Sequence, residues 1–543
     1  MTDFHPTPRP RVSYCLGRPT KGIAAALTAL GTAFDVEFVP DSPEARAQGE
    51  PLVIIGDCGS DLLRDRSPGR VLIVPEETDG AEEIDAIEIC ADIPGAAWLR
   101  QRRLTLPRGT RVSPLQLNPG GEVMARAKSG PVWVRDREGG GVIDRVSLPV
   151  AFKQAQPGKQ VLEIVNEATF PLLLPWMQFL REVTGVDRWR SSLKACFMFD
   201  DPNLHGSSYG YIRFAQVAAW AREHRYHVSF ATVPRDAWFA SSRAAGIFRE
   251  NAEFLSLLIH GNDHVWQEFN QNHDDDARMA MLAQALQRSR RLEASTGLEV
   301  CRVMAPPHGL CRDRVMRGMA RLGFEAASIS NGSIRVGTIE VDGPKIVGSR
   351  PAEIIEGLPI LSRFQFAADS YQKILLAAYL GQPIIPTGHH QDVADGLGIL
   401  RDLADQINGL GSVSWMRMSE IARSHYQWRR AGETMVVRPY ARLLKILIPE
   451  GVTRLQVEPG TGSGFPSGSW TISSHQHGGF NGFDPAAGVA VAASTTVWLK
   501  QSAEDPVDPA TVVLPGFKLW PLARRLACEA RDRVKPWVTR RGG

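Results

Sequence analysis

The chain has 543 residues, of which 43% are hydrophobic and 22% charged, and a formal net charge of +3. This composition is typical of globular proteins and excludes a largely disordered chain, and the length predicts about three domains. No apolar run approaches the roughly 20 residues of a membrane-spanning helix. The positive charge is concentrated at the end, because residues 516–543 hold eight Lys and Arg against two Asp and Glu.

The amino-terminal stretch lacks the apolar segment of a secretory signal peptide. The seven cysteines are odd in number and scattered along the chain, without the paired spacing of a metal site. Reduced cysteines of this kind are typical of a reducing compartment. We therefore expect a cytoplasmic protein.

Residues 10–95 alternate short β-branched runs with helical or loop stretches, which predicts an α/β sandwich domain with a mostly parallel sheet, and the whole domain is assigned to residues 1–150. Within it, residues 104–150 predict a β annex containing a hairpin, with glycines 139–141 at its turn. No phosphate-binding glycine motif occurs there, so no nucleotide site is predicted. Residues 151–192 are predicted to be a helical connector, with a helix from about residue 168 to 183.

Strands and helices alternate again over residues 193–428, where seven strand-like runs, the last at 412–418, predict a (β/α) barrel. Residues 429–503 are all-β and Gly/Pro-rich at their turns, which predicts a small β-sandwich. Residues 504–543 are predicted to be a linker followed by a basic amphipathic tail. The expected fold class is α/β, a barrel flanked by an amino-terminal α/β sandwich domain and a carboxyl-terminal β-sandwich.

Polar clusters follow four of the predicted barrel strands. They are Asp200-Asp201, His260 with His264, His308, and His389-His390. Because the carboxyl ends of barrel strands form one rim, we expect these side chains to converge. The spacing of four between His260 and His264 predicts one face of a helical turn, from which both imidazoles reach one metal ion. Asp201 is the expected third ligand.

Asp200 would then be free to act on metal-bound water. A divalent ion lowers the pKa of bound water to about 7, so a nearby carboxylate can complete its deprotonation. A histidine on the opposite side, His389 or His390, could protonate the leaving group. Zinc is the expected ion, with Co²⁺, Ni²⁺, Mn²⁺ and Fe²⁺ left open. Asn203 is a candidate for the pocket, and His205 and His308 could either line the pocket or make structural hydrogen bonds.

The sequence of motifs FDD, HxxxH, PPxG and a late strand-end histidine resembles the NodB-type polysaccharide deacetylases of carbohydrate esterase family four, over roughly residues 193–425. The resemblance implies a deacetylase-like barrel with Asp200 as general base. It implies a metal triad of Asp201, His260 and His264. It also implies His389 as general acid, with His390 as the near competitor.

The sequence departs from this family at several motif positions. Pro202 follows the aspartate pair where the family has glycine, and Gly261 follows the first metal histidine where the family has Ser or Thr. Ala305 and His308 stand where the family has the arginine that orients the base and an aromatic residue. The family's fourth motif, with its Trp and Asp, is not found in residues 325–370.

We expect a metal-dependent hydrolase that removes an acyl group, N-acetyl above all, from an amino sugar of a surface-polysaccharide or O-antigen precursor, either nucleotide-linked or lipid-linked. The alternative is a catalytically inactive barrel that binds glycans or helps assemble a polysaccharide synthesis machine. In the tail, an apolar residue recurs at helical spacing at Leu519, Leu522, Leu526, Ala530 and Val534. This pattern predicts docking either on the protein's own surface or on the inner face of an anionic membrane. No nucleic-acid partner is expected.

Overall fold

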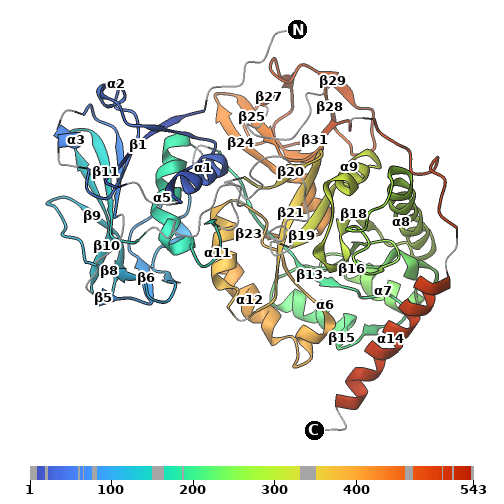
Figure 1. Cartoon of the computed structure of the whole chain (residues 1–543). Coiled ribbons are helices and arrows are strands. Elements are labelled where there is room, and N and C mark those ends of the chain that lie inside the picture. Colours follow the sequence, from blue (N-terminus) through green and yellow to red (C-terminus); the bar gives the residue numbers. More distant parts are fainter. Residues whose placement is uncertain are drawn as a thin grey trace. The chain divides into compact units, whose positions relative to one another are not determined.

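The computed structural model describes residues 9–18, 22–58, 61–64, 66–75, 82–149, 164–185, 189–330, 350–367, 369–458, 469–503, 505–516 and 519–539. The chain divides into two compact units (Figure 1). Unit 1 consists of Met1–Arg190, Asp342–Ser349 and Gln372–Leu380, and unit 2 consists of Ser191–Val341, Arg350–Tyr371 and Gly381–Gly543. Among the described residues, no helix is both long and apolar enough to span a bilayer. The finer division into five parts stays a prediction.

Unit 1 is built on a nine-stranded mixed sheet. In spatial order its strands are β2 (Glu37–Pro40), β1 (Arg11–Leu16), β3 (Leu52–Ile55), β4 (Arg70–Val74), β11 (Gly141–Val146), β10 (Gly130–Glu138), β9 (Glu122–Ala127), β6 (Ala86–Ile89) and β7 (Arg103–Thr105). In this spatial order, each strand from β2 to β11 is parallel to the next, and each strand from β11 to β7 is antiparallel to the next. The predicted α/β domain is confirmed, but its sheet is mixed and not mostly parallel. The predicted hairpin is confirmed, because β10 and β11 turn at Gly139 and Gly140, both with positive φ.

The helices of unit 1 include the predicted connector helix. They are α1 (Ile23–Phe34), α2 (Pro43–Ala47), α3 (Asp61–Arg64), η1 (Ala97–Leu99), α5 (Phe170–Thr184) and nearly all of α11 (Tyr371–Tyr379), beside the small strand pair β5 (Glu82–Glu83) and β8 (Arg111–Val112). Helix α5 packs on α1 and β4. It is held to the sheet by Glu182, whose carboxylate pairs with the buried Arg135 at 3.1 Å.

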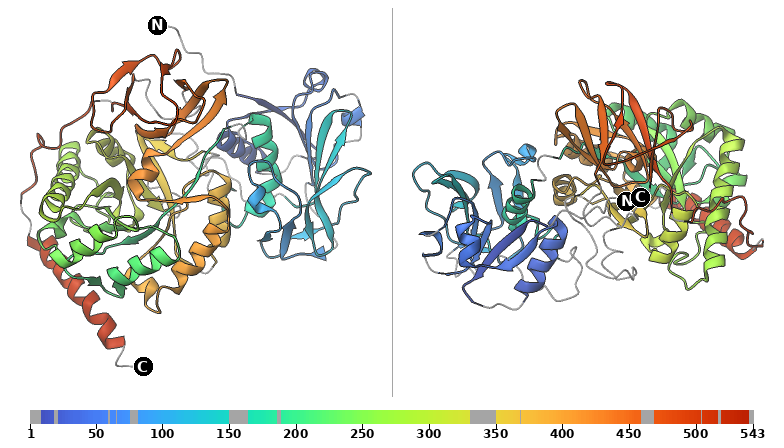
Figure 2. Two further views of the ribbon diagram at one scale, coloured as in Figure 1. Left: turned by 180° about the vertical axis from the view of Figure 1, so that it is seen from behind. Right: turned by 90° about the horizontal axis from the view of Figure 1, so that it is seen from above.

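Unit 2 contains a closed barrel of seven parallel strands, which confirms the predicted barrel (Figure 2). In ring order the strands are β13 (Phe197–Asp200), β16 (Val228–Thr232), β17 (Leu255–His260), β18 (Val300–Ala305), β19 (Ala326–Ser330), β21 (Leu358–Gln365) and β22 (Pro386–Gly388). Small side chains such as Ala231, Ala305 and Ala326 pack in its core with Met198 and Leu258. The carboxyl ends of these strands therefore form one rim.

One strand of the barrel was assigned wrongly from the sequence. The run at 412–418 contains a short strand, β23 (Val413–Trp415), but β23 pairs with β12 (Leu193–Ala195) outside the ring. The remaining place in the ring belongs to β21, which also carries the antiparallel strand β20 (Glu353–Ile355). The sequence of β21, LPILSRFQ, opens with four apolar residues and then mixes polar and apolar ones, so it shows no strict alternation that would identify a strand.

Helices surround the barrel, and a β-sandwich completes unit 2. The barrel helices and turns are α6 (Phe214–Glu223), α7 (Ser242–Glu250), α8 (Asp275–Thr296), α9 (Asp313–Arg321), α12 (Gly398–Asn408), α13 (Met418–Arg423), η4 (Pro234–Trp238), η5 (Pro307–Gly309) and η6 (His390–Val393), beside the strand pair β14 (Ser208–Tyr209) and β15 (Ile212–Arg213). The last helix is α14 (Leu519–Thr539).

The predicted β-sandwich is confirmed as two four-stranded sheets packed over one hydrophobic core. One sheet has the order β24 (Tyr426–Ala431), β25 (Thr434–Pro439), β27 (Arg454–Val457) and β30 (Val489–Ala490). The other has the order β26 (Leu443–Leu447), β31 (Thr496–Gln501), β28 (Trp470–Ser473) and β29 (Asn481–Phe483). Leu444, Leu455 and Leu499 lie in the core between them.

Two buried histidines make the stability of unit 2 sensitive to acid. His227 Nδ1 lies 2.8 Å from the carbonyl oxygen of Glu253 and its Nε2 lies 2.8 Å from Ser256 Oγ, so the neutral ring donates at Nδ1 and accepts at Nε2. Burial lowers the pKa of His227 to about 4. Burial, with the nearby Lys194 as a smaller cause, lowers the pKa of His425 to about 3.

We expect the free energy of unfolding to decrease as the pH is lowered below about 6.5, because the unfolded chain then takes up protons that the folded chain cannot bind. Each histidine should contribute about 1.4 kcal/mol per pH unit, down to about pH 4 for His227 and about pH 3 for His425. Urea unfolding in a chelator at about pH 7.5 and about pH 5 measures the fall. Between these two pH values the free energy of unfolding of His227→Gln should decrease by about 2 kcal/mol less than that of the wild type. His477 is exposed, so His477→Gln should behave like the wild type. An unchanged fall in His227→Gln would contradict the assignment.

Candidate metal centre

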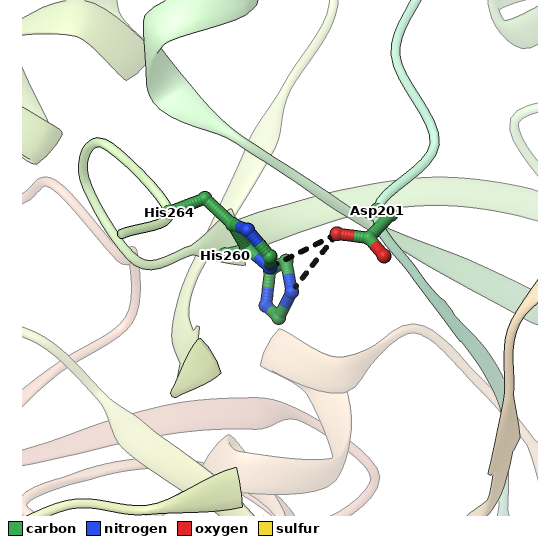
Figure 3. Close-up of side chains that lie close together, drawn as sticks. All are labelled: Asp201, His260 and His264. Carbon is green, nitrogen blue, oxygen red and sulfur yellow. Dashed lines mark ion pairs between the residues drawn. The ribbon is translucent and has the colours of Figure 1, made fainter. Parts of the chain in front are cut away.

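Three predicted ligands meet at the rim of the barrel (Figure 3). His260 is the last residue of β17, and Asp201 directly follows β13. Asp201 Oδ1 lies 3.0 Å from His264 Nε2 and 3.6 Å from His260 Nε2, and the three ligand atoms lie within 4.8 Å of one another. Asp201 and His264 both have positive φ, 81° and 55°, which is uncommon for residues other than glycine and concentrates at functional sites.

The orientation of His260 suits a metal ligand. Its Nδ1 lies 2.8 Å from the carbonyl oxygen of Ala305, so Nδ1 carries the proton and Nε2 turns its lone pair towards Asp201 and His264. Burial alone would raise the pKa of Asp201, but the two imidazoles beside it hold this pKa well below its ordinary value. Two imidazole nitrogens and one carboxylate oxygen match the ligands of Zn²⁺ and neighbouring divalent transition metals, so the donor set fits the expected ion.

The expected helical turn between the two histidines is wrong. Residues 261–264 form a loop, and the imidazoles meet because the chain turns sharply after β17. The buried carboxylate of Glu268 accepts backbone N–H bonds from Asn262 at 3.0 Å, Asp263 at 2.8 Å and His264 at 3.1 Å. A spacing of four brings two side chains together in a helix, but here one carboxylate fixes the same approach by binding three successive backbone amides.

Glycine follows the first metal histidine because this loop leaves no room for a side chain. Gly261 has a φ of 63°, and a Cβ there would lie 2.6 Å from Glu268 Oε2 and 2.6 Å from Pro307 Cγ. The departure from the family pattern at Gly261 is therefore explained by the way Glu268 closes the loop.

Asp200 faces a partner that the sequence did not reveal. Arg363, on β21, donates from Nη1 to both carboxylate oxygens of Asp200 at 2.8 Å, and both side chains are buried. Burial alone would raise the pKa of Asp200, but Arg363, followed by His260 and His389, holds it below its ordinary value. Arg363 thus places a cation beside Asp200, although position 305 is alanine. The missed signal was an arginine inside β21.

The two late histidines lie in different surroundings. His389 is exposed, donates its backbone N–H to Asp392 at 2.7 Å, and is among the charges that influence Asp200. His390 is buried, with its ring against Tyr209 and Tyr211 at centroid distances of 5.4 and 5.7 Å. These surroundings favour His389 as the residue nearer the aspartate pair.

The three pocket candidates lie around the site in different ways. Asn203 is buried and accepts the backbone N–H of His205 at 3.2 Å, which closes a turn after β13. His205 Nδ1 lies 2.7 Å from Glu529. His308, with a φ of 60°, lies at the rim with its ring 5.6 Å from that of His264 and 4.7 Å from that of Trp266. Burial and the neighbouring histidines lower the pKa of His308.

Helix α14 crosses this rim and contacts the main chain of two metal-ligand candidates. Arg525 Nη2 donates to the carbonyl oxygen of Asp201 at 2.7 Å and pairs with Asp236 at 2.7 Å, while Arg524 donates to the carbonyl oxygen of His264. The Tyr209 hydroxyl donates to Asp532 at 3.2 Å. The contacts of the tail with the rim are thus made by charged side chains, while Leu519 and Leu526 of the predicted helical pattern are exposed.

Solved structures that resemble this chain include several deacetylases. The carbohydrate deacetylase Agd3 aligns over 91% of this chain and 99% of its own, with 9% identity and a TM-score of 0.49. The CE4 domain of a xylanase from the hindgut metagenome of Trinervitermes trinervoides aligns over 43% and 90%, with 13% identity and a TM-score of 0.26. A CE4 esterase from Streptococcus mutans aligns over 42% and 87%, with 12% identity and a TM-score of 0.25.

No protein-family model matches the sequence, and no curated protein matches it. At these identities and TM-scores the structural likenesses do not by themselves assign a family or an activity to the chain. Function is therefore inferred from the residues at the rim.

Proposed function

We propose that the chain is a metal-dependent hydrolase that removes the acyl group from an acylated amino sugar. The observation that carries the proposal is the division of labour between two adjacent carboxylates. Asp201 faces two imidazole nitrogens, as a metal ligand would, and Asp200 faces Arg363, as an ionised base would. The pair turns to different partners because Asp200 ends β13 and Asp201 has a φ of 81°.

Each residue has one role in this reaction. Asp201, His260 and His264 would hold a divalent ion, and such an ion supplies a Lewis acid that polarises an acyl carbonyl and acidifies water. Asp200 accepts the proton that the attacking water loses, and Arg363 keeps this carboxylate ionised and oriented. His389 protonates the departing amine, and His308 and Trp266 border the space in which the sugar lies.

The finer parts of the proposal concern the ion, the substrate and the location. Zinc is the proposed ion, supported by the two imidazoles in the donor set. The proposed substrate is an N-acetylated amino sugar of a surface-polysaccharide or O-antigen precursor, which is the substrate class that the motif resemblance implies. All seven cysteines are free thiols, which supports a reducing, cytoplasmic location.

Metal content and acetate release, measured side by side, test this function. The wild type should hold about one equivalent of metal and release acetate from N-acetylglucosamine oligomers. Asp200→Asn should keep the metal and lose at least about 100-fold in kcat, because only the base is removed. Asp201→Ala/His264→Ala should lose the metal as well. Absence of metal in the wild type after incubation with Zn²⁺ would contradict the proposal.

A glycan-binding protein without turnover is the second candidate. The observation that favours it is helix α14, which covers the rim and contacts the main chain of Asp201 and His264. This candidate predicts metal and oligosaccharide binding by the wild type with no acetate released. Turnover that is lost in Asp200→Asn while the metal is retained would exclude it.

A further inference from the structure

Helix α14 exposes an apolar face. Leu519 and Trp520 are 72% and 74% exposed, and Leu526 is 47% exposed. Ala523, Ala527 and Ala530 are exposed on the same side, because their spacings of three, four and seven place them along one stripe. These six residues, Leu519, Trp520, Ala523, Leu526, Ala527 and Ala530, are called the apolar stripe below.

The opposite face of the helix is charged and buried. Arg525, Glu529 and Asp532 are each less than a tenth exposed, and they contact Asp236, His205 and Tyr209 of the barrel rim. A helix on a globular protein ordinarily buries its apolar side and exposes its charges. In α14, three charged side chains are buried together with Pro521 and the half-buried Leu522, while the apolar stripe on the other side is exposed.

Further aromatic side chains are exposed beside the helix. Trp266 follows His264, whose carbonyl oxygen accepts a bond from Arg524 of α14. Phe239 packs against His205, which contacts Glu529 of α14. Exposed aromatic residues at this density mark a contact surface, and their amphipathic rings suit the interfacial region of a bilayer.

The charge of this segment identifies the partner. Residues 516–543 hold eight basic and two acidic residues, and both acidic residues, Glu529 and Asp532, are already turned to the barrel rim. The sequence of the segment is therefore basic, and in its described part Arg531 is an exposed cation beside the apolar stripe. An apolar helical face flanked by cations binds anionic lipid headgroups and inserts into the boundary of the acyl chains.

We propose that α14 docks the barrel rim of unit 2 on an anionic lipid bilayer, with the apolar stripe in the interfacial region. The proposal does not depend on the proposed hydrolysis. Because α14 is tied to the main chain of Asp201 and His264, the docked helix holds the mouth of the metal centre beside the lipid surface. A substrate linked to a lipid would then lie within reach of the site.

Sedimentation of the full-length protein with vesicles tests the docking. The protein should bind vesicles of phosphatidylcholine mixed with phosphatidylglycerol, bind phosphatidylcholine alone much more weakly, and lose affinity as salt rises. Leu519→Ser/Trp520→Ser/Leu526→Ser should bind the mixed vesicles at least about tenfold more weakly, because the insertion of apolar surface is lost. The matched control is Leu447→Ser, a leucine that is 64% exposed on β26 of the sandwich, and it should bind like the wild type.

Equal melting temperatures of the wild type and both variants would show that the exposed positions do not affect folding. Failure of the wild type to bind mixed vesicles would overturn the proposal, as would equal binding by the triple variant. A wild-type dimer in sedimentation velocity that the triple variant dissociates, without vesicle binding, would assign the apolar stripe to a second copy of the chain and overturn the lipid partner.

Discussion

Replacing Arg363 by alanine should lower kcat for acetate release by about 100-fold or more, while the metal stays bound. The side chain of Arg363 donates to both oxygens of Asp200. Without it, a carboxylate buried at the end of β13 loses its cation, and burial then favours the protonated acid, which cannot act as a base. Metal content and kcat, measured on the same sample, separate the two effects.

The same variant should also be less stable. Removing one partner of a buried ion pair costs about 3–5 kcal/mol, since the remaining charge is left unpaired. Arg363→Lys restores a cation but not the planar guanidinium, so it should recover part of the stability and part of the activity. In Asp200→Asn, adding Arg363→Ala should reduce kcat little further, because the two residues act as one unit. Independent, additive losses in the double variant would contradict the pairing.

The barrel and the meeting of Asp201, His260 and His264 could be predicted because their signals are local. Each predicted strand is a short apolar run that ends in polar residues, and this can be seen in the sequence alone. In a parallel barrel the carboxyl ends of all strands lie at one rim, so these polar residues come together. Arg363 could not be found in this way. Its role depends on the closure of the ring, which places β21 two strands from β13, and the strand that carries it has no distinctive period.

Glu268 and α14 show a second limit of prediction from sequence. The spacing of His260 and His264 predicts a helical turn, but the carboxylate of Glu268, four residues after His264, accepts the loop N–H bonds and gives a different backbone. In α14 the helical spacing of leucines was visible, yet the face that docks was decided by Asp236, His205 and Tyr209. These partners lie about 300 residues away in the chain, and no local pattern reports them.

Arg525→Ala should release α14 from the rim. The wild-type guanidinium pairs with the buried Asp236 and donates to the carbonyl oxygen of Asp201, and it is one of the few buried contacts of the helix. Loss of such a pair is worth about 3–5 kcal/mol if the helix stays in place. If the helix detaches, water can solvate Asp236 and the cost of burying an unpaired carboxylate is avoided. We therefore expect the variant helix to detach and the barrel to stay folded.

Hydrogen exchange of the amides in residues 519–539 measures the release. A detached helix is only marginally stable, so its amide hydrogen bonds open often and its amides exchange quickly. Exchange should accelerate by at least about 100-fold in Arg525→Ala. Arg531→Ala is the matched control, since its side chain is 59% exposed and pairs with the adjacent Asp532, and such surface pairs contribute about 0–1 kcal/mol. Equal exchange in the two variants would contradict the anchoring role of Arg525.

Turnover in the same two variants then decides what the docked helix does at the site. If the release of α14 increases kcat/KM for a short soluble oligosaccharide, the helix restricts access to the rim, and lipid docking provides a means of moving it. If release lowers kcat without loss of metal, Arg525 positions Asp201 through its main-chain carbonyl. The two outcomes have opposite signs, because one removes a barrier to substrate and the other removes a support of the ligand loop.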